Sequence, residues 1–151
     1  MTPRQEVGRL YVDRHTIRNM FSVAVSRPFT AFHYLTVPDP GPEGKVHSHE
    51  YALDVCIEAT ALNEHRYVVD IDQLDELVNE VIGEFEGATL NDLDGFAGVN
   101  PSLEHLTTVI ADRLCESSLL QDERFSQLRI VMTEDTSARA EYTRELPVPS
   151  T

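Results

Sequence analysis

Two long segments in which every second residue is apolar constrain the fold of this chain more than any other feature. In the first segment, 21–35, the odd positions form one face, with an interruption at Arg27 beside Pro28. In the second segment, 47–57, the odd positions again share one face. This alternation predicts two strands, which can pair antiparallel across the Pro- and Gly-rich loop 37–45. A bulge is expected at Pro28, which cannot donate to a sheet ladder.

The apolar period becomes helical after the second strand. Asp70 is suited to cap a helix whose apolar residues recur at helical spacing up to Phe85. A second helix is predicted with Asn100 as its N-cap and Pro101 in the first helical position. The buried face of this second helix should carry Leu103, Leu106, Ile110 and Leu114.

Two further strands, 126–134 and 138–145, close the chain. The predicted order is ββααββ, an α+β fold with a four-stranded antiparallel sheet and two helices on one face. Residues 20–146 form this domain, preceded by an N-terminal extension, 1–19, and followed by a C-terminal tail, 147–151. The sheet would have two open edges, which favours a homo-oligomer.

The formal net charge of the chain is −14, and its basic residues are eleven arginines and one lysine. Such a charge disfavours a nucleic-acid partner, because the long-range field repels phosphate. The apolar runs are too short to span a membrane. Cys56 and Cys115 lie in apolar periodic segments and are expected to be buried free thiols of a cytoplasmic protein.

Three histidines form a candidate metal site. His47 and His49 share one face of the second strand, and antiparallel pairing brings His33 of the first strand opposite them. Three imidazoles with a fourth position open are typical of catalytic zinc, which polarises a substrate oxygen. By spacing alone the motif is weak, since histidines this close together are more often surface or hydrogen-bonded residues.

Five motifs in order resemble the 6-pyruvoyltetrahydropterin synthase and 6-carboxytetrahydropterin synthase family, from about Met20 to Arg144. They are FTAFHYL, VHSHEY, VVDIDQLDELV, TLNDLDGFAGVNPSLEHL and TEDTSARAEY. The resemblance implies the T-fold (tunnelling fold), assembled through its sheet edges into homotrimers or homohexamers.

The resemblance also implies site residues and a cofactor. His33, His47 and His49 would be ligands of Zn²⁺, and Glu134 would anchor a pterin, whose guanidine-like edge a carboxylate can bind through two hydrogen bonds. Glu104 matches a family glutamate near the pocket, although a favourable interaction with the helix dipole explains a first-turn glutamate equally well.

Three positions depart from the family pattern. Glu43 stands where the family has its general-base cysteine, which resembles a subgroup with glutamate there; Glu43 is therefore the candidate base, although an exposed loop acid is the plain alternative. Glu86-Gly87 replaces the usual Asp-His pair. Ser48 replaces the glycine between the two histidines.

The resulting hypothesis is a zinc-dependent lyase acting on dihydroneopterin triphosphate or a related reduced pterin. A non-catalytic zinc- and pterin-binding oligomer and a lyase for a non-phosphorylated substrate remain alternatives. The scarcity of basic residues makes a triphosphate difficult to bind, unless Lys45, Arg27 and Arg66 cluster. If Glu43 is not the base, Glu86, Asp92 and His105 are the next candidates.

Overall fold

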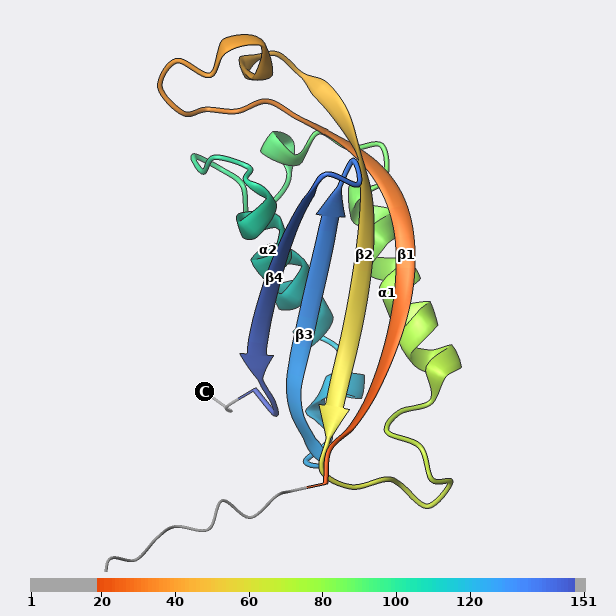
Figure 1. The fold of residues 1–151 in the computed structure, drawn as a ribbon. Helices are drawn as coiled ribbons and strands as arrows, with labels where there is room; N and C mark the ends of the chain where they lie inside the picture. Colours follow the sequence, from red (N-terminus) through yellow and green to blue (C-terminus); the bar gives the residue numbers. More distant parts are fainter. Residues whose placement is uncertain (1–18, 149–151) are drawn as a thin grey trace, which may run out of the picture.

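The computed structural model describes residues 19–148, so nearly all of the predicted extension 1–19 and residues 149–151 of the tail lie outside the described residues. Four antiparallel strands form one sheet in the order β1-β2-β3-β4 (Figure 1). Their bounds are β1 Phe21–His33, β2 His47–Ala59, β3 Phe125–Glu134 and β4 Ala138–Glu145.

The two helices are α1, Ile71–Phe85, and α2, Leu103–Cys115. Both lie on the same face of the sheet, with α1 against β1 and α2 against β3 and β4 (Figure 1). The predicted ββααββ order and the helix-covered sheet are therefore confirmed. None of the helices between residues 19 and 148 is both long and apolar enough to cross a membrane.

The bulge expected at Pro28 is absent. The pairing of β1 with β2 keeps one register from Phe21↔Ala59 to His33↔His47, and Pro28 pairs with Ala52. The backbone N–H groups of Thr30 and Phe32 bond outward, away from β2, so the ring nitrogen of Pro28 faces the same outer edge. An edge strand loses no ladder bond to such a proline.

The start of α2 also differs from the prediction. Its N-cap is Ser102, whose hydroxyl accepts a hydrogen bond from the amide of His105 at 3.1 Å. Asn100 instead accepts from the amide of Thr36 at 2.9 Å and so connects the loop after β1 to the loop before α2. Pro101 precedes the cap rather than opening the helix.

Arg27, the residue that interrupts the apolar face of β1, has partners on α1. Its guanidinium pairs with the carboxylate of Asp75 and donates to the side chain of Asn79 at 3.0 Å. The strand can therefore direct a charge toward a helix without leaving the charge unpaired.

The core lies between the sheet and the helices, where large apolar side chains of both layers pack against each other. Its fully buried residues include Leu53, Ile57, Leu74, Phe85, Leu106, Ile110, Leu114, Leu128 and Ile130. Leu103, expected in this core, is only half-buried. Cys56 is buried, as expected, but Cys115 is half-exposed because it ends α2; both are free thiols.

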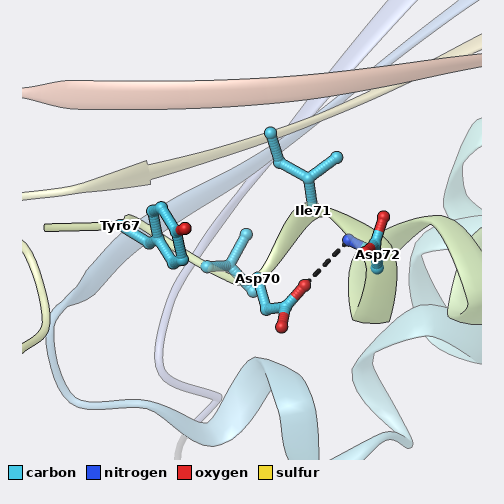
Figure 2. Close-up of a pocket in the computed structure, with 5 residues that line it drawn as sticks. Tyr67, Asp70, Ile71 and Asp72 are labelled. Atoms are coloured by element: carbon cyan, nitrogen blue, oxygen red, sulfur yellow. Dashed lines mark hydrogen bonds between the residues drawn. The ribbon is translucent and has the colours of Figure 1, made fainter. Parts of the chain in front are cut away.

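Asp70 caps α1 as predicted. Its carboxylate accepts from the amides of Asp72 and Gln73, and Figure 2 shows the first of these bonds. Tyr67 and Ile71, exposed by 54% and 56%, line a shallow pocket with the cap, so Ile71 does not join the buried stripe of the helix. The helix starts near the end of the sheet where β1 begins and β2 ends (Figure 1), whereas the histidines lie where β1 ends and β2 begins.

Candidate metal centre and adjoining pocket

The three predicted histidines come together where β1 ends and β2 begins. His33 pairs in register with His47, and His49 is two residues further along the same face of β2. Their ring centroids are 4.7–4.8 Å apart. One ring nitrogen from each histidine lies within 4.8 Å of the others, so this triad can hold a metal ion.

Each imidazole is oriented by a hydrogen bond at its Nδ1 atom. The Nδ1 of His33 bonds to the carbonyl oxygen of Pro101 at 3.1 Å, and that of His47 to the carbonyl oxygen of Lys45 at 2.7 Å. The Nδ1 of His49 bonds to the carboxylate of Asp135. All three partners accept hydrogen bonds, so in the neutral form of each ring the proton belongs on Nδ1 and Nε2 presents a lone pair.

The Nε2 atoms of His33 and His47 lie 3.1 Å apart. Two lone pairs at this separation repel each other unless a proton or a metal ion lies between them. Two nitrogens bound to one tetrahedral ion at about 2.0–2.1 Å are roughly 3.3 Å apart, close to the observed distance. The donor set and its outer partners therefore fit a metal ion.

Burial favours the metal-binding form of one member of the triad, His33. The side chain of His33 is almost fully buried. Burial, followed by the neighbouring His49 and His47, lowers the pKa of His33 below its ordinary value. The neutral imidazole, the form that binds metal, is thus favoured at this position.

Glu134, at the end of β3, lies beside the triad. Its carboxylate oxygen is 3.5 Å from the Nε2 of His49, and it pairs in register with Tyr51 of β2. Burial, together with the charges of Glu134 and Asp135, raises the pKa of the Tyr51 phenol well above its usual range. Tyr51 therefore stays neutral and can donate a hydrogen bond.

A pocket of about 330 Å³ adjoins the triad and collects most of the predicted site residues. His33 and His49 form part of its wall, and Glu43, Glu104 and Glu134 line it from three different segments. Glu43 reaches it because its carbonyl oxygen accepts from the amide of Leu35 at 2.8 Å, which folds the loop back onto β1. One pocket thus adjoins the candidate metal centre and is lined by three carboxylates.

Four residues at this site were not identified from the sequence. Asn100, Ser102 and Arg139 line the pocket, and Asp135 orients His49. Asn100 was predicted only as a helix N-cap, and no sequence pattern indicated a site role for Ser102, Arg139 or Asp135. The register of β2 with β3, which places the turn beside Glu50, was the missing information.

The residues named above as alternative general bases do not line the pocket, and neither do the three basic residues considered for binding a triphosphate. Glu86 accepts from the amide of Thr30 on the outer edge of β1, and His105 bonds to the carbonyl oxygen of Gly95. Neither these two nor Asp92 lines the pocket. Arg27 is paired with α1, so it does not cluster with Lys45.

Comparison with known proteins agrees with this architecture. The family model described as 6-pyruvoyl tetrahydropterin synthase matches residues 22–145. A protein of Archaeoglobus fulgidus, provisionally named a 6-carboxy-5,6,7,8-tetrahydropterin synthase, is 28% identical over 113 residues, 75% of this chain and 89% of that protein.

Two solved structures show the same fold. The 6-pyruvoyl tetrahydropterin synthase of Plasmodium falciparum superposes with a TM-score of 0.69 at 16% identity, covering 84% of this chain and 99% of that one. A catalytic-residue mutant of the Plasmodium vivax 6-pyruvoyltetrahydropterin synthase, with glutamate replaced by cysteine, superposes with a TM-score of 0.70 at 14% identity. The match covers 85% of this chain and 99% of that one. With the family model matching most of its length, the chain belongs to the 6-pyruvoyl tetrahydropterin synthase family.

Proposed function

We propose that the chain is a zinc-dependent lyase that acts on dihydroneopterin triphosphate or a related reduced pterin. The observation that carries this proposal is the single pocket in which the triad residues His33 and His49 meet Glu43, Glu104 and Glu134. Membership of the family supports a pterin as the ligand.

His33, His47 and His49 would hold the zinc ion through their Nε2 atoms. When bound, zinc would polarise an oxygen of the substrate side chain and so make a neighbouring proton more acidic. The chain's own residues would fix the tautomers of the three imidazoles and leave the adjoining pocket open to the substrate.

Glu134 is proposed to anchor the pterin ring. A carboxylate can accept two parallel hydrogen bonds from the amino and N–H groups of the ring edge. Tyr51, directly opposite Glu134 in the sheet, is a neutral phenol that can orient this carboxylate. Glu104, at the start of α2, is proposed as a second polar contact for the substrate.

Glu43 is proposed as the general base that removes a proton from the substrate side chain. It lines the pocket, whereas neither cysteine does: Cys56 alternates with the pocket-facing positions of β2, and Cys115 ends α2. The catalytic glutamate of the Plasmodium vivax enzyme offers a precedent for such a residue within this fold.

One observation favours a different substrate for the same chemistry. Three carboxylates line the pocket, while Arg139 is its one basic lining residue and already lies 3.9 Å from Glu141. With zinc bound, the charges of the ion and Arg139 only balance those of the three carboxylates, so the pocket offers a triphosphate no net positive charge, whereas an uncharged polyol side chain needs none. A non-phosphorylated dihydropterin is therefore the second candidate substrate.

Glu86-Gly87, at the position of the family's Asp-His pair, favours a third possibility. In this chain the carboxylate of Glu86 accepts from the amide of Thr30 at 3.1 Å, and the amide of Gly87 donates to the carbonyl oxygen of Thr30 at 2.7 Å. The two residues thus attach the segment after α1 to the edge of β1. A protein that binds zinc and pterin without turnover would need no proton relay at this position.

Incubation of the zinc-loaded protein with dihydroneopterin and with its triphosphate, followed by product analysis, distinguishes these functions. Release of a shortened side chain from either compound supports the lyase, and the preferred compound identifies the substrate. Pterin binding with no product would support the binding protein. Binding of neither compound would refute the proposal.

The protein is expected to form a homotrimer or homohexamer. In the described structure β1 and β4 are edge strands. Thr30 and Phe32 already have outward partners within the chain, so pairing between subunits would involve β4 and the part of β1 before Thr30. Sedimentation analysis of the full chain should therefore show a multiple of 17.0 kDa. A single species at the monomer mass would contradict assembly through the sheet edges.

Pterin affinity is expected to depend on Glu134. Glu134→Gln keeps the shape but removes the charge, which should cost about 1.5–3 kcal/mol and weaken binding roughly 10- to 100-fold. Fluorescence titration with a reduced pterin measures this. Glu145→Gln, the same change at an exposed position of β4 outside the pocket, is the matched control. Equal affinity for the Glu134 variant and the wild type would show that the anchor is wrong.

A further inference from the structure

Asp135 is the side chain that bonds to the outer nitrogen of one histidine of the triad. It follows β3 at the turn into β4, and its carboxylate accepts the bond from the Nδ1 of His49. We propose that Asp135 is a positioning residue that sets the tautomer of His49 and thereby the affinity of the triad for a metal ion. This inference rests on the metal centre of the proposed function.

Three hydrogen bonds hold Asp135 in place. Its amide donates to the carbonyl oxygen of Glu50 at 2.8 Å, its Oδ1 accepts from the amide of Glu50 at 2.9 Å, and its Oδ2 accepts from His49. Its φ of +48° lies in the left-handed region that aspartate and asparagine tolerate better than most residues. The carboxylate is thus fixed before any metal arrives.

His49 differs from the other two histidines in this respect. Backbone carbonyl groups fix the tautomers of His33 and His47, and no side-chain substitution removes these groups. His49 alone of the triad depends on a side chain for its Nδ1 partner. Its tautomer is therefore the one that a single substitution can change directly.

A competing acceptor faces the opposite nitrogen of the same ring. The carboxylate of Glu134 lies 3.5 Å from the Nε2 of His49. A neutral imidazole carries one proton and can satisfy only one of these two carboxylates. With Asp135 present the proton stays on Nδ1, which leaves Nε2 free for a metal and Glu134 free for a ligand. Without it, the proton would move to Nε2 and bond to Glu134.

Only a carboxylate can meet both demands on residue 135. The amide of Glu50 and the Nδ1–H of His49 are two donors that need two acceptor atoms. In Asp135→Asn, the side-chain oxygen can accept from one donor while the NH₂ group faces the other. With the oxygen on Glu50, the NH₂ group donates to the Nδ1 of His49 and favours the Nε2–H tautomer.

The first measurement is made on metal-free protein, so it does not depend on zinc or on turnover. At a pH where the ring of His49 is neutral, nitrogen NMR of the imidazole should report Nδ1–H in the wild type and Nε2–H in Asp135→Asn. Asp54→Asn is the matched control: it makes the same change on β2, at a carboxylate bonded to Ser26 and outside the pocket. This control should leave the His49 signal unchanged.

The second measurement is the dissociation constant for Zn²⁺, obtained by competition with a chelator. Loss of an outer partner of a ligand typically weakens binding about 10- to 100-fold, and we expect this for Asp135→Asn but not for Asp54→Asn. Asp135→Gly, which also accepts a positive φ, provides a second variant without the side chain and should weaken zinc binding as well.

Two results would overturn the role of Asp135: an unchanged tautomer of His49 in Asp135→Asn, or zinc affinity in both Asp135 variants within about threefold of the wild type. A wild-type protein that binds no zinc would instead refute the proposed function. The tautomer measurement would then still decide whether Asp135 controls His49.

Discussion

Zinc binding is expected to be lost when His47 or His49 is replaced by alanine. Each would supply one of three ligands, so the loss should exceed the roughly 10- to 100-fold effect of an outer partner. Both side chains are only partly buried, so their truncation should leave the core intact. Zinc content after dialysis, together with a dissociation constant from chelator competition, measures the effect.

His65→Ala is the matched control for these variants. Its side chain is 68% exposed and lies 3.5 Å from the neighbouring Glu64. His65 is also outside the triad, so its removal should leave zinc content unchanged. Wild-type zinc affinity in either His47→Ala or His49→Ala would mean that the triad is not the metal site.

The arrangement of the triad followed from strand parity alone. His33, His47 and His49 occupy odd positions on two segments whose odd positions face the core, and the loop between them permits antiparallel pairing. Their convergence therefore needed no knowledge of side-chain contacts. The pattern could not reveal their hydrogen-bond partners, because Pro101 and Asp135 come from loops whose path depends on tertiary packing.

The errors in the fold arose where local signals competed. Asn100 and Ser102 both suit a helix N-cap, and the structure uses Ser102 because Asn100 bonds to Thr36, 64 residues away in the sequence. Pro28 suggested a bulge because its place at the sheet edge was unknown. In both cases a long-range contact or the strand order decided the outcome, and neither is encoded in the nearby residues.

The carboxylates of the pocket also could not be predicted from periodicity. The positions of Glu43 and Glu134 came from the family resemblance, and the structure places both in the pocket beside the triad. Periodicity alone describes Glu43 as an exposed loop acid and Glu134 as a strand-end acid; both descriptions hold in the structure, and neither indicates that the two residues line one pocket. The roles of both residues remain predictions that substitution has to test.

Turnover is expected to fall about 100-fold or more in Glu43→Gln, the usual range for removal of a positioned general base. Zinc should stay bound, because Glu43 is not one of the three proposed ligands. The loss should appear in kcat with little change in KM, since the pterin anchor is untouched. Steady-state kinetics on the compound that the wild type turns over, with zinc content measured in parallel, tests both statements.

Two controls separate the carboxylate of Glu43 from other causes. Glu80→Gln makes the same change on an exposed position of α1, outside the pocket, and should retain full activity. Alkylation of thiols should also leave activity intact, because neither Cys56 nor Cys115 lines the pocket. If Glu43→Gln is as active as the wild type, the base is not Glu43. Glu104 would then be the next candidate, because it lines the same pocket while Glu86, Asp92 and His105 do not.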